Sequence, residues 1–387
     1  RIGPIDVCRT GCLRRPSRTI HSTNNRHPMR TPHTLTLGLV AALLVGAGGC
    51  QLFDRDASRT KPKPSPTQTS GSATVSADSV GKPPAVKPPA DKTATPGQAQ
   101  VAKAETLKGQ GQYELALAEF EKAIEVNPRL TVAYMGAADI YRERGDYTSA
   151  EKNYGRAAEL EPQNFGAQYK HGLMLQLLNR ITESVRAYLR ALAIKPDDFN
   201  ANLNLATAYL QLNEPAEALP YGRRAVQLDS RSAAARSNLG AIYGAMGRHE
   251  EAVIEYQQAA ELAELSSPLL LNLAESLGKT GRYDEMVNTL RQLVATEPTA
   301  AAYERLGFGL FRLRQYPDAL AAFRKSIEID PNHFPALNGI GVCLLNQWGG
   351  SKQTDELARS EALRALRRSL QIDPNQPRIL EILGRYR

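Results

Sequence analysis

Apolar residues recur every three or four positions through most of the chain after residue 100, which is the spacing of amphipathic α-helices. The helical segments are short, and several close on a proline in contexts such as ELEP and EIDP: Pro128, Pro162, Pro196, Pro298, Pro331 and Pro374. The first three of these prolines are 34 residues apart, and three further steps of 34 reach Pro298. A fixed period of this length predicts an array of small helical units.

The period also aligns side chains of one kind in the same column. A turn column contains Gly111, Gly145, Gly247 and Gly281. A later column contains large aromatic residues: Phe120, Tyr154, Tyr188, Tyr256 and Phe323. Each unit is therefore predicted to be two helices joined by a short turn. Small residues stand where the helices cross closely, and aromatic side chains fill the wider gaps.

This pattern resembles the tetratricopeptide repeat, with eight units over residues 101–374. The resemblance implies an all-α fold, namely a right-handed α-solenoid of about eight helix–turn–helix repeats. It also implies that the first helix of each unit lines a long concave face. Two departures fall in one unit, with Pro215 at a turn aromatic position and Gly222 at a large-residue position. Residues 375–387 begin another first helix and are expected to cap the array.

The beginning of the chain is typical of an export signal. Residues 1–28 precede the first methionine, so we interpret them as sequence upstream of the true start or as a basic leader. Residues 29–49 carry Arg30 and then an apolar run of thirteen residues (LTLGLVAALLVGA), too short to span a bilayer but suited to a signal peptide.

The run ends in Ala-Gly-Gly-Cys50, which resembles the lipobox of bacterial lipoproteins, although Ala47 stands where that class favours leucine. The resemblance implies that Cys50 is lipidated, with palmitate among the expected acyl chains. It also implies that the protein is anchored in the cell envelope, facing the periplasm or the exterior. The alternative is an ordinary cleaved signal that releases a soluble protein.

Residues 50–100 are predicted to form a disordered tether after the anchoring cysteine. They are rich in Pro, Ser, Thr and Lys, and no aromatic residue occurs between Phe53 and Tyr113. The net charge of the chain is +8, but residues 1–49 carry +6 and residues 51–100 carry +3, which leaves −1 for residues 101–387. The repeat array therefore has no basic surplus with which to bind nucleic acid.

Sequence motifs for catalysis are incomplete. Gly278-Lys279-Thr280 is similar to the end of a phosphate-binding loop, but Leu273 stands where that loop needs glycine. The histidines of the array, His171, His249 and His333, lie in separate units without metal-ligand spacing. We therefore predict no catalytic, metal or cofactor site, and no enzymatic activity.

One column does suggest binding. The sixth place of successive first helices holds Lys170, Asn204, Asn238, Asn272 and Arg305. An amide both donates and accepts hydrogen bonds, so such a row can pair with the backbone of an extended peptide. The row is similar to that in the superhelical repeats of O-linked N-acetylglucosamine transferases. The alternative is that asparagine is simply common at this place in the repeat. Apolar neighbours that would complete a peptide or helix site are Tyr169, Leu203, Phe308 and Phe311.

The interval from Pro331 to Pro374 is nine residues longer than the repeat period. We place the extra residues at the turn around Trp348, where they are either tolerated length or a contact loop.

Together these features predict a membrane-anchored scaffold that binds a peptide or amphipathic helix of an envelope protein. Two alternatives are a regulatory or truncated relative of a repeat-containing glycosyltransferase and a protein that binds cell-wall glycan. Self-association through the ends of the array also stays open.

Overall fold

The computed structural model describes residues 95–386, and within them the chain forms seventeen α-helices and no strand. The described residues divide into two compact units between Leu212 and Asn213. The first unit contains α1 (Gln98–Gly109), α2 (Tyr113–Val126), α3 (Thr131–Glu143), α4 (Tyr147–Leu160), α5 (Phe165–Leu177), α6 (Ile181–Ile194) and α7 (Phe199–Gln211).

The second unit holds the remaining ten helices. They are α8 (Pro215–Leu228), α9 (Ala233–Ala245), α10 (His249–Leu262), α11 (Ser267–Lys279), α12 (Tyr283–Thr296), α13 (Ala300–Arg312), α14 (Tyr316–Ile329), α15 (Phe334–Gly350), α16 (Glu356–Ile372) and α17 (Pro377–Arg385).

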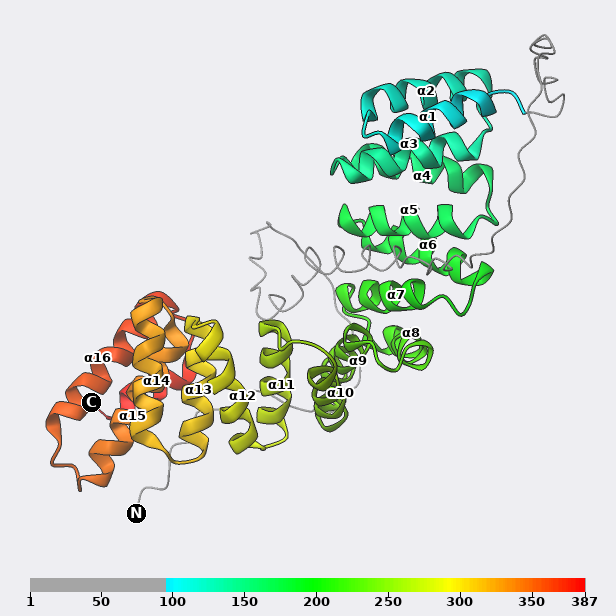
Figure 1. The fold of residues 1–387 in the computed structure, drawn as a ribbon. Helices are drawn as coiled ribbons and strands as arrows, with labels where there is room; N and C mark the ends of the chain where they lie inside the picture. Colours follow the sequence, from blue (N-terminus) through cyan, green and yellow to red (C-terminus); the bar gives the residue numbers. More distant parts are fainter. Residues whose placement is uncertain (1–94, 387) are drawn as a thin grey trace, which may run out of the picture. The chain divides into compact units, whose positions relative to one another are not determined.

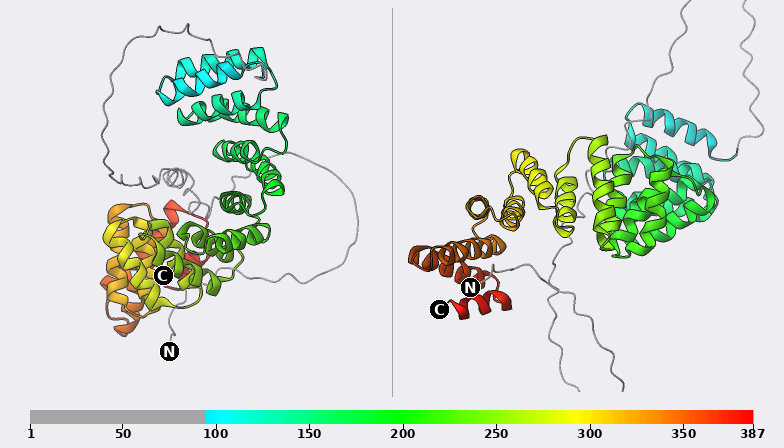
Figure 2. Two further views of the ribbon diagram at one scale, coloured as in Figure 1. Left: turned by 45° about the vertical axis from the view of Figure 1, so that its right-hand side comes forward. Right: turned by 90° about the horizontal axis from the view of Figure 1, so that it is seen from below.

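Within each unit, every helix packs against the next one in the chain (Figures 1 and 2). First helices of successive pairs also touch each other, as α1 touches α3, α5 touches α7, α9 touches α11 and α13 touches α15. This is the α-solenoid of consecutive helix pairs that the period predicted. In each unit, we call the surface formed by its first helices the first-helix face. It consists of α1, α3, α5 and α7 in the first unit and of α9, α11, α13 and α15 in the second.

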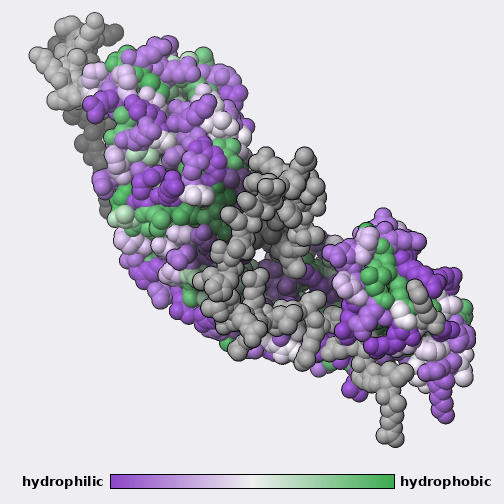
Figure 3. All heavy atoms as spheres, turned by 180° about the vertical axis from the view of Figure 1, so that it is seen from behind, coloured by the Kyte–Doolittle hydropathy of each residue, from purple (hydrophilic) through white to green (hydrophobic). Residues whose placement is uncertain are grey.

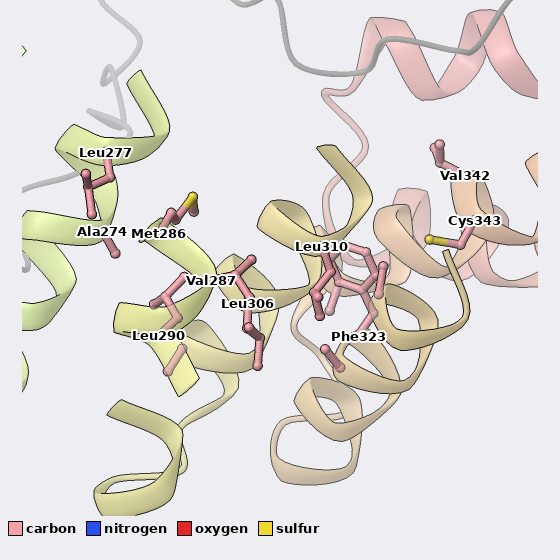
Figure 4. Packing of buried hydrophobic residues seen from close by; sticks show 14 of the residues in the cluster. Ala274, Leu277, Met286, Val287, Leu290, Leu306, Leu310, Phe323, Val342 and Cys343 are labelled. Carbon is pink, nitrogen blue, oxygen red and sulfur yellow. The ribbon is translucent and has the colours of Figure 1, made fainter. Parts of the chain in front are cut away.

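Small residues on the first helix receive large side chains from the second helix of the same pair. A Cβ added to Gly172 would lie 2.8 Å from the ring of Tyr188, and one added to Gly240 would lie 2.8 Å from the ring of Tyr256. These contacts explain why glycine occurs in the middle of helices, where it otherwise costs stability. In the second unit the resulting core includes Leu277, Leu290, Leu306 and Phe323 (Figure 4).

The turns between paired helices require left-handed backbone. The four glycines of the turn column have φ between 74° and 78°. Where the column lacks glycine, Asn179, Asn213 and Arg314 adopt φ of 59°, 58° and 63°. Asparagine tolerates this conformation better than other non-glycine residues, and arginine is strained there.

Polar side chains cap the N-terminal ends of several helices. An oxygen of the residue before the helix accepts a hydrogen bond from the backbone N–H three residues later at Asp146, Asn164, Asp198, Ser232, Thr299 and Asp355. Each such bond satisfies an N–H that the helix itself leaves unpaired.

The division between the units falls inside the fourth helix pair, which carries both departures noted in the sequence. Pro215 is accommodated as the first residue of α8, where the missing N–H costs nothing. Gly222 replaces the large side chain of the other second helices, and Cδ1 of Ile242 from α9 occupies that space.

The last helix pair corrects one expectation about the nine extra residues. Helices α15 and α16 have 17 residues each, compared with 13 and 14 in the preceding pair. The connection between them, residues 351–355, is only two residues longer than residues 313–315. Most of the insertion therefore extends the two helices, because additional helical turns can continue burying apolar side chains.

Candidate functional site

The first-helix face of the first unit is organised around Asp139 in α3. Lys170, from the predicted polar row, donates from Nζ to Asp139 Oδ1 at 2.7 Å. Lys108 Nζ of α1 lies 3.5 Å from Asp139 Oδ2. One carboxylate thus joins three successive first helices, and Glu105 Oε2 lies 4.0 Å from the same Lys108 Nζ.

The same carboxylate also satisfies a buried tyrosine. Tyr154, whose ring is fully buried in α4, donates its hydroxyl proton to Asp139 Oδ1. Burial by itself would raise the pKa of Asp139. The hydrogen bonds from Lys170 and Tyr154, with the charges of the two lysines, outweigh burial and hold the pKa below its ordinary value. Asp139 is therefore ionised at neutral pH.

An apolar stripe runs along α5 beside this network. Phe165, Tyr169, Leu173 and Leu177 follow one another at intervals of four residues, and all four are half-buried. The rings of Phe165 and Tyr169 are stacked with centroids 5.8 Å apart. Lys195 Nζ lies 4.7 Å from the centroid of Phe165.

Two predicted residues of α7 behave differently from each other. Asn204 Nδ2 donates to the hydroxyl of Tyr169 at 3.1 Å, so the polar row contacts the apolar stripe. Leu203 is only 5% exposed, and its side chain contributes to the packing rather than to an open surface. The expectation that Leu203 provides a contact pocket is therefore not met in this structure.

The second unit carries the remaining polar residues of the row on α9, α11 and α13. The side chains of Asn238, Asn272 and Arg305 are all half-buried. Burial raises the pKa of the Tyr256 hydroxyl, and a hydrogen bond with Asn272 partly offsets that effect. Arg305 forms an ion pair with Glu275 of the preceding first helix, with 3.8 Å between NH2 and Oε2.

Aromatic residues gather at the end of α13. Phe308 meets Tyr283 edge-on with ring centroids 6.3 Å apart, and Phe311 lies 5.4 Å from Tyr316. The guanidinium of Arg312 lies 4.5 Å from the centroid of Tyr283. Both predicted phenylalanines are half-buried, so part of each ring faces outward.

In the first unit, the structure thus joins Asn204 to Tyr169, whereas Lys170 is paired with Asp139. In the second unit, Asn272 lies on α11 and Arg305 on α13, and the ion pair of Arg305 with Glu275 connects these two helices. Sequence reasoning missed the acidic partners Asp139 and Glu275. In the sequence, each acidic residue precedes its basic partner by about the length of one repeat minus one helical turn. This spacing could have revealed both ion pairs.

Other features singled out in the sequence have structural roles. Lys279 is the last residue of α11 and Thr280 follows it, whereas a phosphate loop would precede a helix. Cys343 is 2% exposed, and burial raises the pKa of its thiol to about 12.

Trp348 packs edge-on against Tyr386 with centroids 5.8 Å apart and lies under the guanidinium of Arg359. These contacts make it part of the packing around α17.

Neither a metal site nor a membrane span is present in residues 95–386. No three His, Cys, Asp or Glu side chains in that range are grouped so that they could hold a metal ion. None of the helices described is both long enough and apolar enough to cross a bilayer. Cys50, the apolar run before it and the tether lie outside the described residues.

Family models described as tetratricopeptide repeat match this chain over more than half of its length. One matches four overlapping pairs of repeats, at residues 101–165, 135–199, 169–233 and 203–267. Two others match residues 269–300 and 300–333. A comparison with curated proteins found no match.

Several solved structures are similar to parts of this chain at low sequence identity. A tetratricopeptide repeat protein from Parabacteroides merdae is 16% identical, with a TM-score of 0.46 over 64% of this chain and 98% of that one. YrrB, described as a TPR protein with an unusual peptide-binding site, is 23% identical, with a TM-score of 0.44 over 52% and 99%. PilW, a type IV pilus biogenesis factor, is 21% identical, with a TM-score of 0.44 over 52% and 94%.

Proposed function

Because the chain belongs to the tetratricopeptide repeat family, whose fold serves as a scaffold for protein–protein interaction, we propose that its first-helix face binds a peptide or an amphipathic helix of an envelope protein. The observation that carries the proposal is the row of amide and charged side chains on successive first helices. In α5 this row runs beside four half-buried apolar residues at helical spacing.

The chemistry of this face suits a bound segment of protein. Amides such as Asn204 and Asn272 make one hydrogen bond each to a tyrosine hydroxyl and retain further donor and acceptor capacity. Half-buried rings such as Phe308 and Phe311 can bury apolar side chains of a partner at little entropic cost. Polar groups would then fix the register of the segment, and the rings would supply most of the affinity.

Affinity capture from solubilised cell envelopes tests this proposal. The full chain is compared with a variant in which Asn204, Asn238 and Asn272 are replaced by alanine, with folding checked by circular dichroism. Partners that the parent recovers and the folded variant loses are the expected result. Recovery of the same partners by both proteins would contradict a role for the amide row.

We further propose that Cys50 anchors the protein to a membrane, on the far side of the inner membrane. The support is the apolar run that ends in small residues before this cysteine, since several acyl chains on one residue bind a bilayer more firmly than a single chain. Metabolic labelling with a palmitate analogue should label the parent and not Cys50→Ser. Labelling of both, or of neither, would contradict the anchor without affecting the proposed partner site.

A further inference from the structure

Glu304 stands out on the first-helix face of the second unit. It occupies the column that holds Tyr169, Leu203, Ser237, Leu271 and Asn338 in neighbouring repeats, none of which carries a charge. Glu304, Phe308 and Phe311 are four and seven residues apart in α13, which places them on one side of the helix. The carboxylate therefore lies on the same side of α13 as the aromatic residues of the proposed binding surface.

Glu304 makes no hydrogen bond or ion pair with any residue in the range 95–386, although its side chain is half-buried. Burial raises the pKa of its carboxyl group, and the charge of Arg305 only partly offsets this. Arg305 itself is directed to Glu275. A carboxylate that loses part of its hydration without gaining a partner costs free energy, and an incoming donor would recover some of it.

The reason for the missing partner lies in the next repeat. In the first unit, Asn204 follows Tyr169 by 35 residues and donates a hydrogen bond to it. The residue 35 positions after Glu304 is Gly339, which has no side chain to donate. A Cβ at Gly339 would lie 2.5 Å from the ring of Phe323, so the core packing excludes any larger residue there. The polar row therefore has no side chain at position 339 that could donate a hydrogen bond to Glu304.

We propose that Glu304 receives a lysine or arginine side chain of the bound segment, while Phe308 and Phe311 contact an apolar residue next to it. This inference rests on the proposed function and adds the chemistry of the partner, which is a basic residue adjacent to an apolar one. Charge complementarity favours a cation, since a carboxylate without a donor gains most from a positively charged one.

A selection experiment with the full chain tests this inference. The parent protein is used to enrich peptides from a random nonapeptide library in mRNA display. We expect the bound pool to be enriched in Lys or Arg beside an apolar residue. The strongest binder is then resynthesised with its basic residue replaced by norleucine, which keeps the aliphatic chain and removes the charge.

Affinity is measured for both peptides on the parent and on Glu304→Gln. Removing either charge should weaken binding about tenfold, and removing both should weaken it no further than one alone. Glu264→Gln, in the exposed connection between α10 and α11, is the matched control and should bind like the parent. Glu304→Leu, which restores the residue type of Leu203 and Leu271, should fold at least as stably as the parent and show the same loss.

The outcomes separate this inference from the proposal on which it rests. A pool without basic residues, or independent effects of the two charge removals, would overturn the assignment of Glu304 and leave peptide binding intact. Failure of the parent to enrich any peptide would contradict the proposed function itself.

Discussion

Lys170 and Asp139 form an ion pair between α5 and α3, with 2.7 Å between Nζ and Oδ1, and the same carboxylate accepts the hydroxyl proton of the buried Tyr154. The pair therefore links the half-buried polar row to the core of the first unit. Lys170 is held in place by this pair, which limits the ways in which it can meet a partner.

Replacing Asp139 with Asn should destabilise the first unit by about 1–2 kcal/mol at pH 7, because two lysines and Tyr154 lose a charged acceptor. The folded pKa of Asp139 is below its ordinary value. Its stabilising contribution is therefore present above the unfolded pKa of about 3.9 and is lost as the pH falls through the folded pKa.

Urea denaturation at pH 7 and at pH 2 measures this difference. The parent and Asp139→Asn should differ at the higher pH and converge at the lower one. Glu261→Gln, an exposed carboxylate in α10, serves as the control. A difference that is equal at both pH values would show that the charge of Asp139 is not responsible.

Gly240 and Gly244 in α9 provide a matched test of the close helix packing. Gly240→Ala should lower stability by about 1–3 kcal/mol, since the new methyl group meets the ring of Tyr256 at 2.8 Å. Gly244→Ala meets nothing within 4 Å and should stabilise the helix by up to about 1 kcal/mol. Thermal denaturation checks both, and equal effects would contradict the packing described for this pair.

Arg314 is the residue of the turn column least suited to its backbone conformation, with φ of 63°. Arg314→Gly should stabilise the second unit by about 1 kcal/mol because it relieves this strain. The reverse change at an equivalent turn, Gly281→Ala, should destabilise by a similar amount, given a φ of 78°. If the denaturant midpoints of both variants moved in the same direction, this explanation would be refuted.

Trp348 is the one tryptophan of the chain, so its fluorescence reports on the packing around α17. Trp348→Ala should destabilise that end by about 1–3 kcal/mol through loss of the contacts with Tyr386 and Arg359. Recovery of envelope partners should be unchanged, as expected for a residue engaged within the chain. Loss of partners by a folded variant would restore the alternative of a contact loop.

Most of the fold was predictable because each repeat has the same local requirements. The helix pairs, the turn column and the column of large residues on the second helices all follow from spacing along the chain. The insertion around Trp348 was misplaced because an added helical turn and a longer loop have the same sequence length. On the face shown in Figure 3, hydrophilic residues predominate and hydrophobic residues gather in a few areas.

The site residues were only partly predictable. A column position places Asn204 and Leu203 on adjacent sides of one helix, but it does not determine how deeply neighbouring helices cover each of them. Leu203 is buried for this reason, whereas Asn204 reaches Tyr169. The isolation of Glu304 depends on Phe323 filling the place beside Gly339, which becomes visible only when the helices are packed.

Site-specific photo-crosslinking in cells tests the central claim most directly. A benzoylphenylalanine at position 169 or 308 would probe the first-helix face in each unit, and one at Ile254, which is 51% exposed on the second helix α10, would be the control. We predict protein adducts from at least one of the first two positions and none from the third. Adducts from position 254 alone, or from no position, would contradict recognition by the first-helix face.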